Sequence, residues 1–145
     1  MDRRKRNRLC VWLIILGLGN FLVYATVYAI IGGDATNGDI QPDGACFVRG
    51  HFVHGLKGVQ QMVPRWVWIY SYIHSISIWP SIAEVLLAML MLARPHIMAT
   101  YQNGIMKGTT LVTVMATVIV LVTTLIMISF IVAFVSELVA HHPGT

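Results

Sequence analysis

Three runs of this chain contain no Asp, Glu, Lys or Arg: residues 9–33, 66–83 and 108–136. A helix needs about 20 apolar residues, at about 1.5 Å of rise each, to cross a hydrocarbon core about 30 Å thick. Each run meets or nearly meets this length, and together they leave little of the 145 residues for a water-soluble domain. The sequence therefore predicts a small membrane protein with three transmembrane helices.

The predicted fold class is an all-α membrane protein with a short external loop that resembles a β-hairpin. Only 11% of the residues are charged, against about 25% in soluble domains. The loop contains the turn pairs Asn37-Gly38 and Asp43-Gly44, which favour a hairpin. We expect one membrane domain, 1–145, with helices at about 10–31, 66–93 and 109–140, an external loop at 32–65 and a cytoplasmic loop at 94–108.

The distribution of Lys and Arg predicts the orientation. Five basic residues precede the first helix and two lie in the loop 94–108, whereas three lie in the loop 32–65. By the positive-inside rule, the N-terminus and the loop 94–108 are cytoplasmic, and the C-terminus is external. The expected location is the plasma membrane, the inner membrane of a bacterium. The net charge of +4 then reflects topology, so we expect a lipid bilayer and no nucleic acid as partner.

Small and polar residues form a seam along the second helix. Its members follow one another at spacings of four, three, four, three and four residues, and are Tyr70, His74, Ser77, Ser81, Glu84 and Ala88. This heptad spacing places them on one side of the helix. Small and hydroxyl-bearing residues allow helices to approach closely in lipid. We therefore interpret the seam as a helix-packing surface, with a matching stripe of Gly17, Asn20 and Tyr24 on the first helix.

Glu84 is the seam residue with the strongest functional implication. It lies near the predicted midplane of the membrane, where ionisable side chains are costly and often mark ion or proton pathways. One hypothesis makes it a proton relay or a site for a cationic substrate. The other makes it a neutral or hydrogen-bonded group that meets Asn20, Tyr24, a threonine of the third helix or a residue of a partner subunit.

His74 suggests a second type of site. Three helices, a cytoplasmic N-terminus and one histidine in the second helix resemble the cytochrome b anchor subunits of succinate dehydrogenases. The segment Ser71-Tyr-Ile-His74 is similar to the Ser-x-x-His pattern around their haem-ligating histidine. The resemblance implies that His74 ligates a haem b, with a partner subunit supplying the second histidine. The Arg-His pair and the downstream Asp that such anchors often carry are missing.

The predicted external loop also offers metal ligands. Cys46, His51 and His54 combine a thiol with two imidazoles, a set that suits Zn or Cu. The alternative is that they are ordinary interfacial residues. The chain has no Gly-rich phosphate loop, no His-Glu-x-x-His and no Gly-x-Ser-x-Gly, so no motif indicates an NTPase or a hydrolase.

The sequence favours a non-catalytic accessory subunit of a larger integral membrane complex, with larger membrane protein subunits as partners. We expect the complex to be energy-transducing, either respiratory or photosynthetic, with a role in electron transport. No catalytic residue, enzyme activity or cofactor of its own is expected, a haem b or a metal ion being the exceptions considered above. The alternatives are a haem or quinone anchor that uses His74, and a small homo-oligomeric proton-coupled transporter that uses Glu84.

Overall fold

The computed structural model describes residues 2–50, 60–102 and 106–141. These residues are mostly helical and include a small three-stranded sheet. The elements in chain order are α1 (Arg3–Ile31), β1 (Asp34–Ile40), β2 (Cys46–Arg49), β3 (Gln61–Val63), α2 (Arg65–Thr100) and α3 (Gly108–Ala140). All three helices are long and apolar enough to cross a membrane, which confirms the predicted number of candidate spans.

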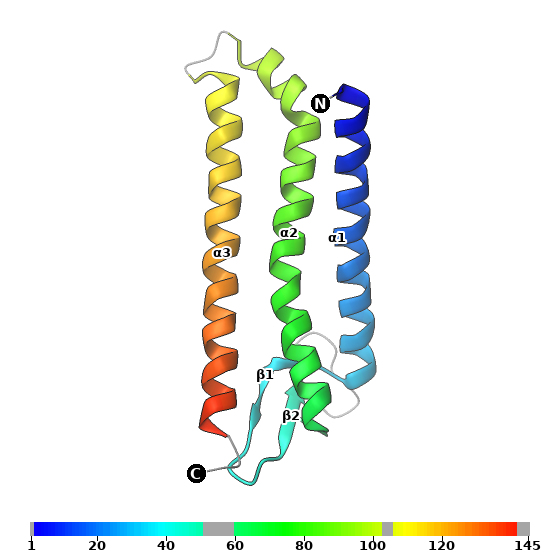
Figure 1. Ribbon diagram of the computed structural model, residues 1–145, viewed down its shortest axis with the longest axis vertical. Helices are drawn as coiled ribbons and strands as arrows, with labels where there is room; N and C mark the ends of the chain where they lie inside the picture. Colours follow the sequence, from blue (N-terminus) through cyan, green and yellow to red (C-terminus); the bar gives the residue numbers. More distant parts are fainter. Residues whose placement is uncertain (1, 51–59, 103–105, 142–145) are drawn as a thin grey trace.

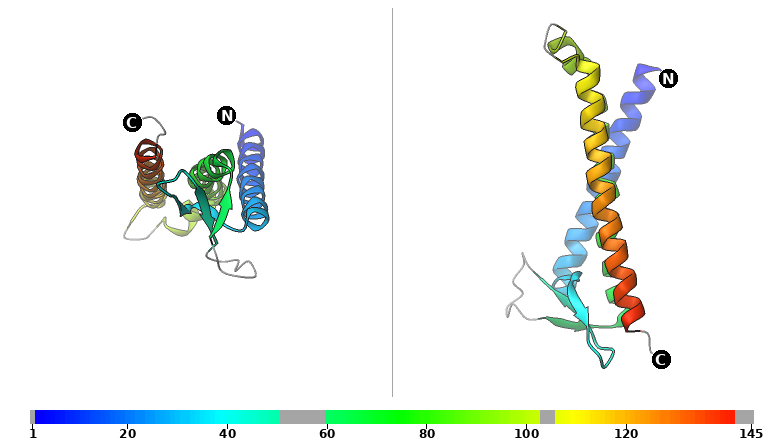
Figure 2. Two further views of the ribbon diagram at one scale, coloured as in Figure 1. Left: turned by 90° about the horizontal axis from the view of Figure 1, so that it is seen from below. Right: turned by 90° about the vertical axis from the view of Figure 1, so that its left-hand side faces the viewer.

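The three helices stand side by side, with α2 between α1 and α3 (Figures 1 and 2). Successive helices run in opposite directions. The start of α1 and the connection between α2 and α3 therefore lie at one end of the molecule, here called the N-terminal end. The sheet and the end of α3 lie at the other, here called the sheet end (Figure 1).

The sheet has the order β1-β2-β3, and both strand pairs are antiparallel. The hairpin turn between β1 and β2 is closed by a hydrogen bond from the Gly44 N–H to the Gln41 carbonyl. Asn37-Gly38, predicted as a turn pair, instead lies within β1, where the pairing register is irregular. A Cβ at Gly38 would overlap the Phe47 carbonyl, so the close approach of the strands accounts for this glycine.

The hydrophobic core lies at the sheet end, where the sheet packs against the start of α2. Val48 of β2 and Trp68 of α2 are completely buried, and Tyr72 lies one helical turn beyond Trp68. The end of α3 closes the core, since Phe134 stacks on Trp68 with ring centroids 6.0 Å apart. Aromatic rings contribute large buried areas, and this cluster fixes the sheet to two of the three helices.

Two helices extend beyond the predicted bounds. α1 begins at Arg3 rather than near residue 10, and α2 continues through Pro95 to Thr100. The first helix was predicted to begin where the uncharged run begins, and the second to end before Arg94-Pro95, because charges and proline commonly mark helix ends. Arg and Lys are good helix formers, so α1 continues through them. Pro95 removes one backbone hydrogen bond without ending α2, and the last part of α2 bends toward α3 (Figure 1).

Candidate functional site between the first two helices

A cluster around Asn20 joins the middle of α1 to α2. The Asn20 amide donates hydrogen bonds to Ser81 Oγ at 2.8 Å and to Ser77 Oγ at 3.2 Å. Its carbonyl oxygen lies 3.2 Å from His74 Nε2. Three predicted seam residues therefore contact the same side chain of α1. Hydrogen bonds between helices are one of the forces that hold helices together in lipid.

Close backbone packing accompanies these hydrogen bonds. Gly17, one turn before Asn20, is buried against α2. A Cβ at Gly17 would lie 2.5 Å from Val85 Cγ2 and 3.1 Å from the Ser81 carbonyl oxygen. A Cβ at Gly19, in contrast, would have no atom within 4 Å. Gly17 is therefore the small residue that allows α1 to approach α2, whereas Gly19 faces away from it.

A second cluster, around Asp34, lies where α1, α2 and β1 meet. Asp34 is 3% exposed. Its carboxylate accepts hydrogen bonds from Tyr24 Oη at 2.6 Å, from Ser75 Oγ at 2.7 Å and from Ser71 Oγ at 3.2 Å. Thr36 donates two more, from its hydroxyl and its N–H. A carboxylate that is buried with this many donors is held as an acceptor.

Asp34 carries no functional signal in its local sequence, because it follows Gly32-Gly33 and resembles an ordinary helix stop. The signal that could have found it is Ser71 and Ser75, two hydroxyl residues one turn apart on the second helix. Ser71 also accepts a hydrogen bond from the Ala35 N–H at 3.1 Å. Asp34 and its partners thus link the first strand to both helices.

His74 connects the two clusters by ring contacts. It is 9% exposed, and the rings of Tyr24 and Tyr70 approach it edge-on with centroids 5.5 Å away. Because the Asn20 amide donates to the two serines, its oxygen is free to accept from a protonated His74 Nε2. Haem ligation through Nε2 would break this hydrogen bond. His74 Nδ1 is buried without a hydrogen-bond partner among the described residues, so these contacts account for one of the two ring nitrogens.

The remaining seam residues, Tyr70, Glu84 and Ala88, make no hydrogen bond to Asn20. Tyr70 is partly exposed, at 46%, and Ala88 is buried. Glu84 lines a groove of about 260 Å³ between α2 and α3, together with Thr123 and Thr124. The structure does not bring Glu84 together with Asn20 or Tyr24, whose hydrogen bonds go to the two clusters above. Within the described residues, Glu84 has no hydrogen bond or ion pair.

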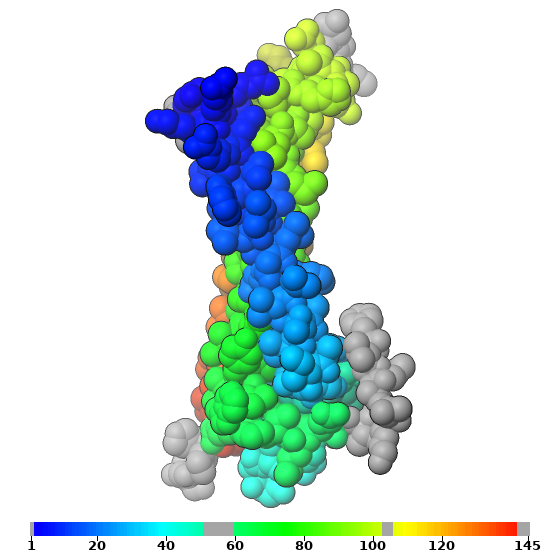
Figure 3. Space-filling model, turned by 90° about the vertical axis from the view of Figure 1, so that its right-hand side faces the viewer, coloured from blue at the N-terminus to red at the C-terminus, as the bar shows by residue number. Residues whose placement is uncertain are grey.

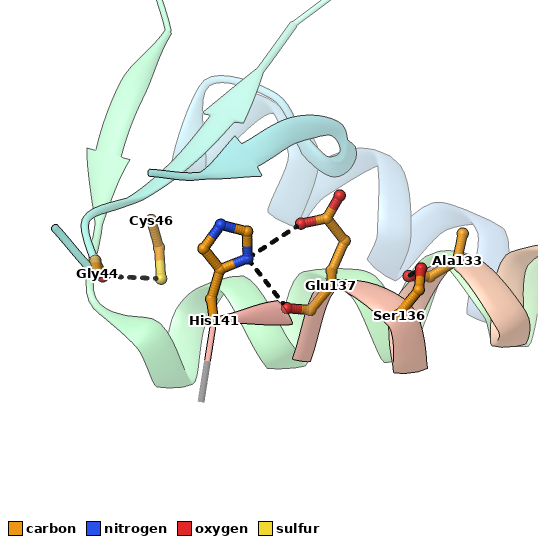
Figure 4. A network of polar contacts seen from close by, with 6 residues as sticks. All are labelled: Gly44, Cys46, Ala133, Ser136, Glu137 and His141. Atoms are coloured by element: carbon orange, nitrogen blue, oxygen red, sulfur yellow. Dashed lines mark hydrogen bonds and ion pairs between the residues drawn. The ribbon is translucent and has the colours of Figure 1, made fainter. Parts of the chain in front are cut away.

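Cys46, the described member of the predicted metal set, lies at the sheet end near the end of α3 (Figure 4). The other two members, His51 and His54, lie outside the described residues. Among the residues that the structure describes, no three His, Cys, Asp or Glu are grouped so that they could hold a metal ion. Burial raises the pKa of the Cys46 thiol, opposed by the positive charge of Arg65, and a protonated thiol is a poor metal ligand. His141 Nδ1 lies 3.7 Å from a Glu137 carboxylate oxygen, which closes the end of α3.

Comparison of the chain with protein-family models, with curated proteins and with solved structures found no match. The structure itself therefore defines the class of protein: a chain of three apolar helices, of which the first two are joined by polar clusters that are partly or fully buried.

Proposed function

We propose that the chain crosses the plasma membrane, the inner membrane of a bacterium, three times, with the N-terminal end in the cytoplasm. The charge distribution supports this orientation. The basic residues at the N-terminal end are Arg3, Arg4, Lys5, Arg6, Arg8, Arg94 and Lys107, whereas the described ones at the sheet end are Arg49 and Arg65. Because basic residues are enriched on the cytoplasmic side, the sheet is then external.

Within that membrane, the protein acts as a non-catalytic accessory subunit of a larger complex, which we expect to be energy-transducing. The observation that carries this proposal is the groove between α2 and α3, in which Glu84 lies beside two threonines without a hydrogen-bonding partner among the described residues. A carboxylate at this depth is costly unless it is protonated or paired. A helix of a larger subunit, with a hydrogen-bonding side chain opposite a protonated Glu84, would satisfy it.

The surface of α3 supports the same proposal. Of its 33 residues, only Gly108 and Thr123 are fully buried. Several of its hydroxyl side chains bond to their own helix, as Thr113 does to the Thr109 carbonyl. Such residues can face either lipid or a neighbouring helix. An ionised Glu84 without a partner, in contrast, can face only a neighbouring helix. The face of α2 and α3 that carries Glu84 is therefore the proposed contact with the complex.

The test is mild purification followed by native mass measurement of the wild type and two matched variants. Larger subunits should co-purify with the wild type and with Glu84→Gln, which keeps the shape and hydrogen-bonding capacity. They should be lost with Glu84→Lys. Glu137→Lys is the control, because it makes the same change on an accessible carboxylate at the sheet end. Purification of the wild type without other subunits would refute the proposal.

One observation favours a second function. Glu84 also borders a groove of about 520 Å³ between α1 and α2, so it is reached from both sides of α2, as a transport carboxylate would be. In a homo-oligomeric proton-coupled transporter, Glu84→Gln would keep assembly but abolish transport, because an amide cannot titrate. Reconstituted vesicles with a pH-sensitive dye would measure this. If vesicles with the wild-type protein show no proton flux, the transporter function is excluded.

A further inference from the structure

Two grooves meet at the N-terminal end, where the start of α1 lies beside the end of α2 (Figure 3). The outer groove, of about 460 Å³, is lined by Arg6, Arg94 and Gln102, with Pro95, Met98 and Ala99. The second is the groove of about 520 Å³ between α1 and α2, which Arg6 also lines. Arg6 therefore lies where the outer groove continues into the second groove. Both volumes are typical of sites for small molecules.

The arginines of the outer groove are not neutralised within the described residues. Among the described residues, the only ion pair joins His141 to Glu137, at the opposite end of the molecule. The Nε of Arg6 is buried and has no hydrogen-bond partner among the described residues. A buried donor without an acceptor is unfavourable. An anion bound in the outer groove would provide such an acceptor, and a planar guanidinium matches a phosphate especially well.

The second groove has the chemistry of an acyl-chain site. Its lining on α1 includes Leu9, Cys10 and Leu13, and its lining on α2 includes Leu87 and Met91. From Arg6 to Leu13 the groove follows seven residues, which is about 10 Å along the helix. Glu84 lies at the deep end. An apolar chain attached to a phosphate at Arg6 would therefore lie against leucine and methionine side chains for most of this length.

We propose that the N-terminal end binds one anionic phospholipid, whose phosphate lies between Arg6 and Arg94 and whose acyl chain follows the groove between α1 and α2. Charge complementarity selects the occupant, because both arginines are cationic and the groove below them is apolar. Basic pockets between membrane helices commonly bind anionic headgroups in this way. Glu84 borders this groove as well as the one between α2 and α3, but Arg6 and Arg94 line only the grooves at the N-terminal end. Substitutions of the two arginines therefore test the lipid site separately from the proposed α2–α3 contact.

The experiment is a lipid titration of the purified full-length protein in detergent, followed by native mass spectrometry. The lipids are phosphatidylglycerol and, as the zwitterionic comparison, phosphatidylcholine. The variants are Arg6→Gln and Arg94→Gln, with Arg65→Gln as a control that removes the same charge at the sheet end. Because one arginine near an anionic headgroup contributes about 1 kcal/mol, each site variant should weaken phosphatidylglycerol binding about fivefold.

Four results would overturn the proposal. The first is equal binding of the two lipids by the wild type. The second is equal loss of binding in Arg65→Gln and Arg6→Gln, which would indicate a general charge effect. The third is full displacement of the lipid by millimolar inorganic phosphate, which would indicate a headgroup site without a chain groove. Retained binding in Arg6→Gln, with a change only in oligomeric mass, would instead assign this face to a second copy of the chain and contradict the lipid site.

Discussion

Replacement of Asp34 by alanine should release the sheet from the helices. Asp34 accepts two short hydrogen bonds, from Tyr24 at 2.6 Å and from Ser75 at 2.7 Å. A hydrogen bond to a charged group contributes about 1.5–3 kcal/mol. Ser75 can retain its second acceptor, the Ser71 carbonyl at 2.9 Å, whereas Tyr24 loses the carboxylate and keeps its interaction with Ser75. We therefore expect Asp34→Ala to destabilise the sheet end by about 3 kcal/mol, near the lower limit for two such bonds.

Cys46 reports this opening directly. It lies in β2, is 3% exposed, and can react with a thiol reagent only when the sheet opens. In a Cys10→Ser background it is the only thiol of the chain. If opening is fast relative to labelling, the rate follows the opening equilibrium. A change of about 3 kcal/mol then raises the labelling rate about 100-fold at neutral pH.

The matched control for this experiment is Asp39→Ala, which removes an exposed carboxylate from the same strand. Its labelling rate should stay within about threefold of the wild type, since surface changes rarely exceed 0.5 kcal/mol. Asp34→Asn should fall between the two, because the amide keeps one acceptor oxygen. Equal labelling of Asp34→Ala and Asp39→Ala would refute the argument, and would mean that the aromatic core alone holds the sheet.

Three further predictions concern the packing of α1 on α2, the Cys46 thiol and the orientation in the membrane. Gly17→Ala should be less stable than Gly19→Ala by about 1–3 kcal/mol, a typical cost of overpacking, and thermal unfolding in detergent would measure it; equal stability would mean that α1 does not pack on α2 through Gly17. The raised pKa of Cys46 favours the thiol in the folded state, so stability should be full below the pKa of a free thiol, about 8.5, and should fall as pH rises above it. Cys46→Ser should remove this slope, and its persistence would assign it to another group. In intact cells, a reagent that cannot cross the membrane should reach Cys46 of an Asp34→Ala variant but not Cys10, and labelling of Cys10 alone would reverse the proposed orientation.

The three helices could be predicted from the sequence because apolar length alone decides whether a helix can cross a membrane. The spacing of the seam also placed His74, Ser77 and Ser81 on one side of their helix. What the spacing could not provide is the partner of each residue, because that depends on the register between α1 and α2. Asn20 meets Ser81, which is 61 residues away in sequence.

Asp34 is the most buried polar residue among those described, yet the sequence pattern does not indicate its burial. Its local sequence is that of a turn, and its burial comes from Ser71 and Ser75, which are 37 and 41 residues away. The strands were partly missed for a similar reason. β3 has three residues, too few for a periodic pattern, and Gly38 indicated a turn although it serves the close contact of β1 with β2.

Asp34 and Glu84 differ in how completely their carboxylates are satisfied. At the sheet end, the Asp34 carboxylate has five hydrogen bonds, although the Trp68 Nε1 in the core beside it is buried without a partner among the described residues. Toward the N-terminal end, the Arg6 Nε and the Glu84 carboxylate have no partners among the described residues and border grooves. Unsatisfied groups are where binding gains most. Substitutions at the sheet end should therefore change stability without changing what the protein binds, whereas those at Arg6 and Glu84 should change binding while the fold persists.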